Sequence, residues 1–256
     1  MSPEFKDLFS GQSTDYAKFR PGYPDALFGY LASLVDQHDT AWDCGTGNGQ
    51  AALKLTDHFD HVIATDPSEK QLASAARHPG IEYRNAPAES SGLPDRSVSL
   101  IAVAQAFHWF KQNEFFTEAR RVLTPQGVLA LWCYELAKIT PEVDAVVYQL
   151  YKGTLGSYWE KERLLVEEGY RHVRIPLAEI APPKFEMTAV WSIEHLIGYL
   201  GTWSALQTYI RKNGTNPLET VYANLKSAWG AEKTHSVRWE LGLRVCRNGS
   251  EKTQIL

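Results

Sequence analysis

The 256-residue chain has little of what would mark a secreted, metal-binding or membrane protein. It holds three cysteines, Cys44, Cys133 and Cys246, whose odd number and spacing match no zinc motif. All three lie in apolar runs, so we expect small buried side chains in a reducing compartment. No apolar run approaches the ~20 residues that span a bilayer. The first twelve residues lack the basic start and apolar stretch of a secretory signal. These absences favour a cytoplasmic protein without a metal or a membrane partner.

A basic surface is also missing. The net charge is −4, which gives no support to a nucleic-acid partner held by phosphate contacts. Hydrophobic residues make up 44% and charged residues 22%, the balance of an ordinary globular protein. The length fits one α/β domain with an added lobe better than two independent domains. We expect a monomer or a homodimer.

Strand-like and helix-like hydrophobic patterns alternate along the middle of the chain. Short apolar strands are expected at Thr40–Cys44, His61–Thr65, Ile81–Arg84, Val98–Ala104 and Gly127–Tyr134. Helices are expected between them at Gln50–Phe59, Ser68–His78 and Lys111–Leu123. Strands that alternate with helices predict βαβ units, a mostly parallel sheet and right-handed crossovers.

The pattern changes beyond residue 135. Helices are expected over Thr140–Glu168 with a break near Gly153–Gly156, and at Ser192–Leu200, Trp203–Lys212 and Pro217–Trp229. Strands are expected at Lys184–Thr188 and His235–Arg247. We therefore divide the chain into cap helices (1–39, around Tyr16–Pro24), a ligand-binding core (40–135), a mainly helical lobe with one sheet strand (136–234), and a final strand and tail (235–256). The eight tryptophans and twelve tyrosines suit an enclosed, partly apolar pocket in such a lobe.

Three glycines follow the first expected strand: Gly45, Gly47 and Gly49. In an open α/β sheet, ligands bind at this carboxyl end of the strands. A phosphate loop would need Gly-Lys-Ser/Thr, which is missing, and this disfavours nucleoside triphosphate hydrolysis. The dinucleotide fingerprint would need a glycine where Gln50 stands, which disfavours a dehydrogenase. Asp66 ends the second strand, where a carboxylate can accept hydrogen bonds from ribose hydroxyls.

With Asp43 ahead of it, the Gly-x-Gly-x-Gly turn resembles the first motif of class I S-adenosylmethionine-dependent methyltransferases. Further segments resemble later motifs of the same family: Asn85–Glu89, Gly92–Leu100, Gln105–Phe110 and Arg120–Gly127. Two positions depart from the family pattern. Pro87 stands where an acidic residue is usual, and Gln126 stands where a glycine is usual. Three outer segments resemble the small-molecule group that includes trans-aconitate methyltransferase: Tyr16–Pro24, Leu200–Ala205 and Trp239–Arg244.

The resemblance implies a fold, a donor and donor contacts. The fold is a Rossmann-like, doubly wound, mostly parallel seven-stranded sheet with an antiparallel last strand and a helical substrate lobe. The donor is S-adenosylmethionine, which leaves as S-adenosylhomocysteine, without a metal. The implied donor contacts are Tyr16, Arg20, Asp43, Gly45, Gly47, Gly49, Asp66, Pro67, Ala88, Glu89 and Gln105.

The acceptor site is less sharply defined. His108 follows the fourth strand, and we favour a positioning role for it over a general base. Trp109, Tyr199, Trp203 and Arg211 are candidate substrate contacts, the last three at spacings that could share one helix side. A carboxylate acceptor needs no base, whereas a phenol, amine or carbon acceptor can require one. We expect methyl transfer to a small molecule at oxygen, with a carboxylate as one candidate. The alternatives are nitrogen or carbon methylation, or donor binding without catalysis.

Overall fold

A computed structural model describes residues 19–249, in which eight strands form the central sheet. Their order is β3-β2-β1-β4-β5-β8-β6, and β7 pairs with β8. The first five in this order run parallel, whereas β8 runs antiparallel to β5, β6 and β7. The strands are β1 Thr40–Cys44, β2 His61–Asp66, β3 Ile81–Asn85, β4 Val98–Ala104, β5 Leu123–Tyr134, β6 Ala178–Ile180, β7 Glu186–Trp191 and β8 His235–Arg247.

Nine α-helices are described within the same residues. They are α2 Asp25–Ser33, α3 Gln50–Leu55, α4 Glu69–Ala73, α5 Gln112–Val122, α6 Pro141–Tyr148, α7 Arg163–Glu167, α8 Ile193–Gly201, α9 Ser204–Asn213 and α10 Pro217–Trp229. Short helical turns of other kinds occupy Phe107–Trp109, Gln149–Thr154 and Gly156–Tyr158. None of the helices in this part of the chain has the length and apolarity to cross a membrane.

The predicted mostly parallel α/β sheet with an antiparallel end strand is confirmed. The predicted count of seven strands is wrong, because β6 is three residues long and too short to give a pattern. Because of β6, the segment 136–234 contains two strands, whereas one was predicted. The predicted helix Ser68–His78 stops at Ala73. The chain leaves it there because the Ala76 N–H bonds to the Asn48 carbonyl beside the glycine turn.

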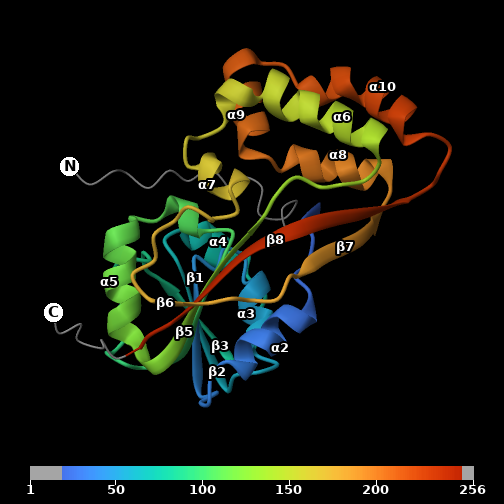
Figure 1. Cartoon of the computed structure of the whole chain (residues 1–256). Helices are drawn as coiled ribbons and strands as arrows, with labels where there is room; N and C mark the ends of the chain where they lie inside the picture. Colours follow the sequence, from blue (N-terminus) through green and yellow to red (C-terminus); the bar gives the residue numbers. More distant parts are fainter. Residues whose placement is uncertain (1–18, 250–256) are drawn as a thin grey trace.

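The sheet is apolar on both faces, as buried parallel strands require. Residues of one face, such as Val62, Ala102 and Trp132, pack with α2 and α3. Residues of the other face, such as Trp42, Ile101 and Leu131, pack with α5 and α7. Figure 1 shows α5 on one side of the strands and α2 with α3 on the other. The three cysteines are free and buried, as predicted.

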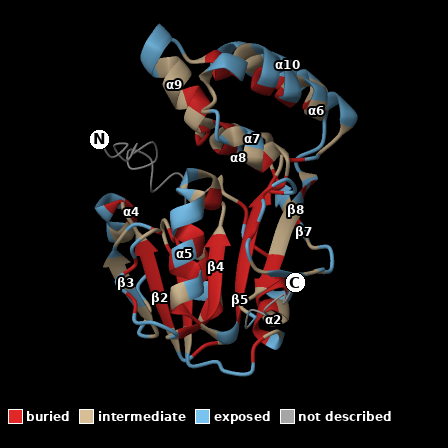
Figure 2. Ribbon diagram, turned by 60° about the vertical axis from the view of Figure 1, so that its left-hand side comes forward, coloured by how far each residue is buried: buried red, intermediate tan, exposed pale blue. Residues whose placement is uncertain are grey.

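A lobe of α6, α8, α9 and α10 lies beyond the carboxyl ends of the parallel strands (Figures 1 and 2). The 13-residue β8 joins it to the core, since Leu241–Arg247 pair with β5 and His235–Glu240 pair with β7. Trp239 and Val245 of this strand belong to one continuous hydrophobic cluster that runs from α2 into the lobe. The lobe is therefore fixed to the sheet by a shared strand and a shared core.

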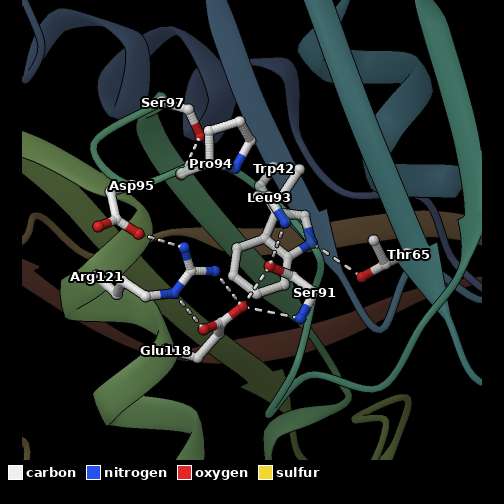
Figure 3. A network of polar contacts seen from close by, with 9 residues as sticks. All are labelled: Trp42, Thr65, Ser91, Leu93, Pro94, Asp95, Ser97, Glu118 and Arg121. Atoms are coloured by element: carbon white, nitrogen blue, oxygen red, sulfur yellow. Dashed lines mark hydrogen bonds and ion pairs between the residues drawn. The ribbon is translucent and has the colours of Figure 1, made fainter.

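A buried carboxylate ties the loop between β3 and β4 to α5 (Figure 3). Glu118 Oε1 accepts hydrogen bonds from the Ser91 N–H at 2.8 Å and from the Ser91 hydroxyl at 2.5 Å. Arg121 donates to both Glu118 oxygens at 2.8 Å and to Asp95 at 2.6 Å. The same loop carries Ala88 and Glu89, so this network positions one wall of the predicted donor site.

Burial alone would raise the pKa of Glu118, but hydrogen bonds from Arg121 and Ser91 outweigh it and hold the pKa below its usual value. A lowered pKa means that the folded state stabilises the ionised carboxylate. This contribution to stability is present above the unfolded-state pKa and is lost as pH falls through the folded-state value.

Replacing the carboxylate should therefore weaken the fold at neutral pH. We expect Glu118→Gln to lower the free energy of unfolding by about 2 kcal/mol, because charge-assisted bonds to Arg121 and Ser91 are lost. Urea unfolding at neutral pH measures the change. Glu114→Gln, at an exposed position on the same helix, is the control and should shift the midpoint little. Equal midpoints for the two variants would show that the network contributes nothing.

Candidate functional site

The predicted site residues gather where the direction of chain winding reverses. Strand β1 pairs with β2 on one side and with β4 on the other, all three parallel. Their carboxyl ends therefore lie side by side, at the switch point where open α/β sheets bind ligands. The glycine turn follows β1, Asp66 ends β2, and Gln105 follows β4.

The three glycines each have a left-handed φ, of +72°, +56° and +83° along the chain, but serve different purposes. A Cβ on Gly45 would lie 2.6 Å from the Ala106 Cβ, and one on Gly49 would collide with the Tyr83 hydroxyl. Those two glycines allow close packing inside the protein. Nothing described lies within 4 Å of a Cβ built on Gly47, so this glycine faces open space at the turn.

Asp43 lies beneath this turn and is fully buried. Its Oδ2 accepts a 2.6 Å hydrogen bond from the Thr46 hydroxyl. No described donor meets hydrogen-bond geometry with Oδ1, although the nearby Ala52 N–H lowers the pKa slightly. Burial dominates and raises the pKa of Asp43 to about 7. In this structure Asp43 supports the turn from below, and its contact with a donor stays a prediction.

Asp66 links the ends of β1 and β2. Its Oδ2 accepts from the Gly47 N–H at 2.9 Å and its Oδ1 from the Ser68 N–H at 2.8 Å. These bonds hold both oxygens at the edge of the turn. Each carboxylate oxygen can accept more than one hydrogen bond, so these backbone bonds are compatible with bonds from hydroxyl groups.

Gln105 has a φ of +54°, a strained value for a residue with a side chain. Its N–H bonds to the Trp132 carbonyl at 2.9 Å, and its amide Nε2 reaches the Tyr134 carbonyl at 3.4 Å. The buried Oε1 has no hydrogen-bond partner within the described chain. Strained backbone and an unsatisfied buried acceptor together make Gln105 a candidate for contact with a ligand.

The other predicted donor contacts lie around the same edge. Ala88 is buried, and Glu89 Oε1 accepts from the Lys111 N–H at 2.7 Å. Pro67 is half-buried directly after Asp66. Arg20 donates to the Tyr134 hydroxyl at 2.9 Å and to the Thr202 carbonyl at 3.3 Å, which connects the N-terminal segment to β5 and the lobe. Tyr16 lies outside the described residues.

His108 lies in the turn after β4. A 3.0 Å hydrogen bond joins its Nδ1 to the Tyr170 hydroxyl, with a direction set by the imidazole tautomer. The ring keeps some exposure, yet burial lowers the pKa of His108 to about 3, with a smaller contribution from the Arg163 charge. The imidazole is therefore neutral at physiological pH, and one of its nitrogens already has a protein partner.

The candidate acceptor contacts do not all come together. Tyr199 and Trp203 are buried with ring centroids 6.0 Å apart, and the Arg20 guanidinium lies 5.2 Å from the Tyr199 ring centre. Trp109 is exposed and its ring lies tilted against that of His108, with centroids 4.8 Å apart. The prediction that Tyr199, Trp203 and Arg211 share one helix side is wrong. The chain breaks between α8 and α9, and Arg211 is exposed and bonded to Thr208.

Sequence reasoning missed four residues of this junction between core and lobe: Tyr134, Tyr151, Arg163 and Tyr170. Tyr134 binds Arg20, Tyr170 binds His108, and Arg163 packs on Tyr151. No motif marks Arg163 or Tyr151, whose contacts come from separate segments of the lobe. The aromatic richness of the lobe was the available signal, but it did not single out residues.

Neither of two surface grooves coincides with these residues. One is lined by Arg77–Pro79 and Ile81–Tyr83, the other by Ile193, Glu194, Lys226 and Trp229–Lys233. The candidate site is therefore described by its residues and not by a groove. Within residues 19–249, no group of three or more His, Cys, Asp or Glu side chains could hold a metal ion.

Comparison with known proteins gives the family. Residues 42–131 match the family model described as a methyltransferase domain, which covers β1 through most of β5. The chain is 36% identical over 230 residues to a protein of Dictyostelium discoideum named as a methyltransferase, with 88% of each covered. It is 23% identical over 277 residues to a protein of Saccharomyces cerevisiae named as an S-adenosylmethionine-dependent methyltransferase, covering 92% of this chain and 95% of the relative.

A solved structure from Anaeromyxobacter dehalogenans, named as a type II methyltransferase, is 43% identical with a TM-score of 0.84. It covers 91% of this chain, and all of that chain is matched. The fold and the switch-point site thus define a Rossmann-like transferase. The chain belongs to the class I S-adenosylmethionine-dependent methyltransferases.

The buried Asp43 should make stability depend on pH. Its raised pKa means that the folded state binds the proton more tightly than the unfolded chain. Stability therefore falls as pH rises from about 4 to about 7 and stays lower above that. Asp43→Asn removes this dependence. We compare the free energies of unfolding of the donor-free variant and of the wild type at about pH 5 and at about pH 8. The variant's value minus the wild-type value should be a few kcal/mol larger at about pH 8 than at about pH 5.

Urea unfolding of both proteins at the two pH values measures this difference of differences. A constant cost of the amide cancels in the comparison, because it is present at both pH values. A gap that does not change with pH would show that Asp43 ionises normally beneath the turn.

Proposed function

We propose that this methyltransferase acts on a small molecule and places the methyl group on oxygen, with a carboxylate as acceptor. The observation that carries the proposal is the state of His108. A neutral imidazole with a pKa of about 3 and a bond to Tyr170 is a poor proton acceptor. An acceptor that is already ionised needs no such base.

The residues at the switch point fit the donor. Open space at Gly47 accommodates a ligand against the backbone, and the carboxylate of Asp66 is held with acceptor capacity for the ribose hydroxyls. The unpartnered Gln105 Oε1 lies at the end of the neighbouring strand. Ala88 and Glu89 lie on the loop that Glu118 fixes, where they can frame the adenine.

When bound, the donor supplies a methyl group on a positively charged sulfur. A carboxylate oxygen provides the electron pair for the new O–CH₃ bond, and the S–CH₃ bonding pair stays on sulfur. The products are a neutral ester and a neutral thioether, and no proton is released. The protein is then required to align the two groups and exclude water. The buried aromatic side chains Tyr199 and Trp203 can enclose the acceptor for this purpose.

His108 and Tyr170 have a positioning role in this proposal. Their hydrogen bond joins the turn after β4 to the segment that follows α7, and Phe107 packs against Tyr170 with ring centroids 5.3 Å apart. Methylation of nitrogen or carbon, and donor binding without turnover, remain the competing functions. Each gives a different outcome in the tests below.

Asp66 tests the donor assignment. We expect Asp66→Ala to lower affinity for S-adenosylhomocysteine at least tenfold, because charge-assisted hydrogen bonds of ~1.5–3 kcal/mol each are lost. Calorimetry measures the change, and Asp60→Asn, at an exposed position directly before the same strand, is the control. Loss of the turn contacts could also weaken binding, so a 2′,3′-dideoxy analogue separates the causes. Wild type and mutant should bind the analogue equally. A mutant that still prefers the hydroxylated compound would contradict the ribose role.

His108 tests the acceptor chemistry. With saturating donor, the maximal rate of the wild type should show no step due to His108 between about pH 6.5 and about pH 8.5, because burial keeps the pKa of this imidazole at about 3. Any pH effect of Asp43 in this range should be the same in His108→Ala. His108→Ala should raise the acceptor KM without adding or removing a titrating limb. If the maximal rate of the wild type rises with pH through a pKa of ~6.5 and that of the mutant does not, His108 acts as a general base. This result would contradict a carboxylate acceptor.

A further inference from the structure

Arg163 is a half-buried arginine at the start of α7 that has no acidic partner among residues 19–249. Its guanidinium carbon lies 5.0 Å from the Trp159 ring centre and 5.5 Å from the Tyr151 ring centre. Arg84, Arg121 and Arg244 each pair with a carboxylate within 3 Å. No carboxylate of the described chain forms an ion pair with Arg163, since the nearby Glu167 pairs with Lys152 at 2.8 Å.

A chain of hydrogen bonds fixes the orientation of this guanidinium. Arg163 Nε donates to the Tyr151 hydroxyl at 2.9 Å, and that hydroxyl donates to Glu167 Oε1 at 2.7 Å. Lys152 holds the same carboxylate at 2.8 and 2.9 Å. Tyr151 is almost fully buried, so the relay is rigid. The Tyr151 hydroxyl binds only Nε of Arg163. The two terminal nitrogens of Arg163 make no hydrogen bond to a described residue.

The guanidinium faces the junction between the core and the lobe. Its charge acts on groups of both parts. It lowers the pKa of His108 after β4, although burial is the larger cause there. It also opposes the larger effect of burial, which raises the pKa of Cys133 on β5 and of Tyr199 on α8. The remaining charged or titratable groups that face it are Tyr151, Glu167 and Tyr170.

Aromatic rings connect Arg163 to the candidate acceptor contacts. The ring centroid of Trp203 lies 5.5 Å from that of Trp159, 5.5 Å from that of Tyr151 and 6.0 Å from that of Tyr199. Arg20 contacts another ring of this group, with its guanidinium 5.2 Å from the Tyr199 ring centre. Two guanidinium groups therefore border one aromatic wall.

Packing on aromatic rings accounts for the position of Arg163 but not for its uncompensated fork. Cation–π contacts involve the face of a guanidinium and leave the N–H groups in the guanidinium plane unbonded. A solvated surface arginine would be indifferent to this, but Arg163 is half-buried and held by a buried tyrosine. The planar fork matches a carboxylate, with two parallel hydrogen bonds.

We propose that Arg163 binds a carboxylate of the methyl acceptor, with Tyr151, Glu167 and Lys152 as the residues that position it. The proposal rests on the function proposed above and specifies its substrate class: an organic acid whose carbon skeleton packs on Trp159 and Trp203. In this arrangement Arg163 determines acceptor specificity, and binding of the donor does not depend on it.

Matched pairs of an acid and its amide test the proposal, because they share shape but not charge. The probes are benzoate with benzamide and succinate with succinamide, titrated by calorimetry into protein saturated with S-adenosylhomocysteine. Wild type should bind at least one acid tenfold or more tightly than its amide. Arg163→Met should abolish the preference, and Arg163→Lys should restore part of it because the charge returns without the fork.

Arg174→Met is the matched control, since Arg174 is exposed and the charge change is the same. It should keep the full preference for the acid. Tyr151→Phe removes the acceptor for Arg163 Nε and should reduce the preference severalfold, while affinity for S-adenosylhomocysteine stays within twofold. A purely structural Tyr151 would leave the ratio of acid to amide affinity unchanged.

The outcomes separate the two proposals. Failure of wild type to bind S-adenosylhomocysteine would contradict the donor site proposed above. Normal donor-product binding with no preference for either acid would overturn the assignment of Arg163. So would a preference that survives in Arg163→Met.

Discussion

The site depends on the junction between the turn after β1 and the end of β2. The Gly45 and Thr46 N–H groups both bond to the Thr65 carbonyl at 2.9 Å, and the Gly47 N–H bonds to Asp66 at the same distance. These bonds require the parallel register that sets Cys44 opposite Thr65. They also require left-handed backbone at the glycines, one of which faces open space. The open backbone and the fixed carboxylate, the two features that a nucleoside donor needs, are products of one strand pairing.

The core could be predicted from the sequence because its signals are local. Five apolar runs, a glycine turn and an aspartate at the end of a strand each lie within a few residues, and the parallel sheet places them together. The short β6 and the early end of α4 could not be predicted. The first is set by pairing with the distant β8, and the second by a bond from Ala76 to the glycine turn. Both depend on contacts that no local pattern encodes.

The acceptor side shows the opposite relation between sequence and structure. Tyr199 and Trp203 were recognised as candidates, but they lie on either side of the break between α8 and α9, and Arg211 lies on the surface. The orientation of Arg163 is set by Tyr151 and Glu167, which come from two separate segments of the chain. The neutral His108 and the unpaired Arg163 fork favour the same chemistry. In the proposed mechanism the protein supplies positive charge and alignment to an acceptor that is already ionised, and it supplies no base.

The fate of the transferred methyl group tests this account most directly. A small-molecule extract incubated with the enzyme and donor labelled in the methyl group can be analysed by mass spectrometry before and after mild alkaline hydrolysis. A methyl ester loses its label as methanol, whereas methyl groups on nitrogen, carbon or ether oxygen keep it. The account predicts labelled products whose label is released by base. Labelled products that resist hydrolysis would contradict a carboxylate acceptor.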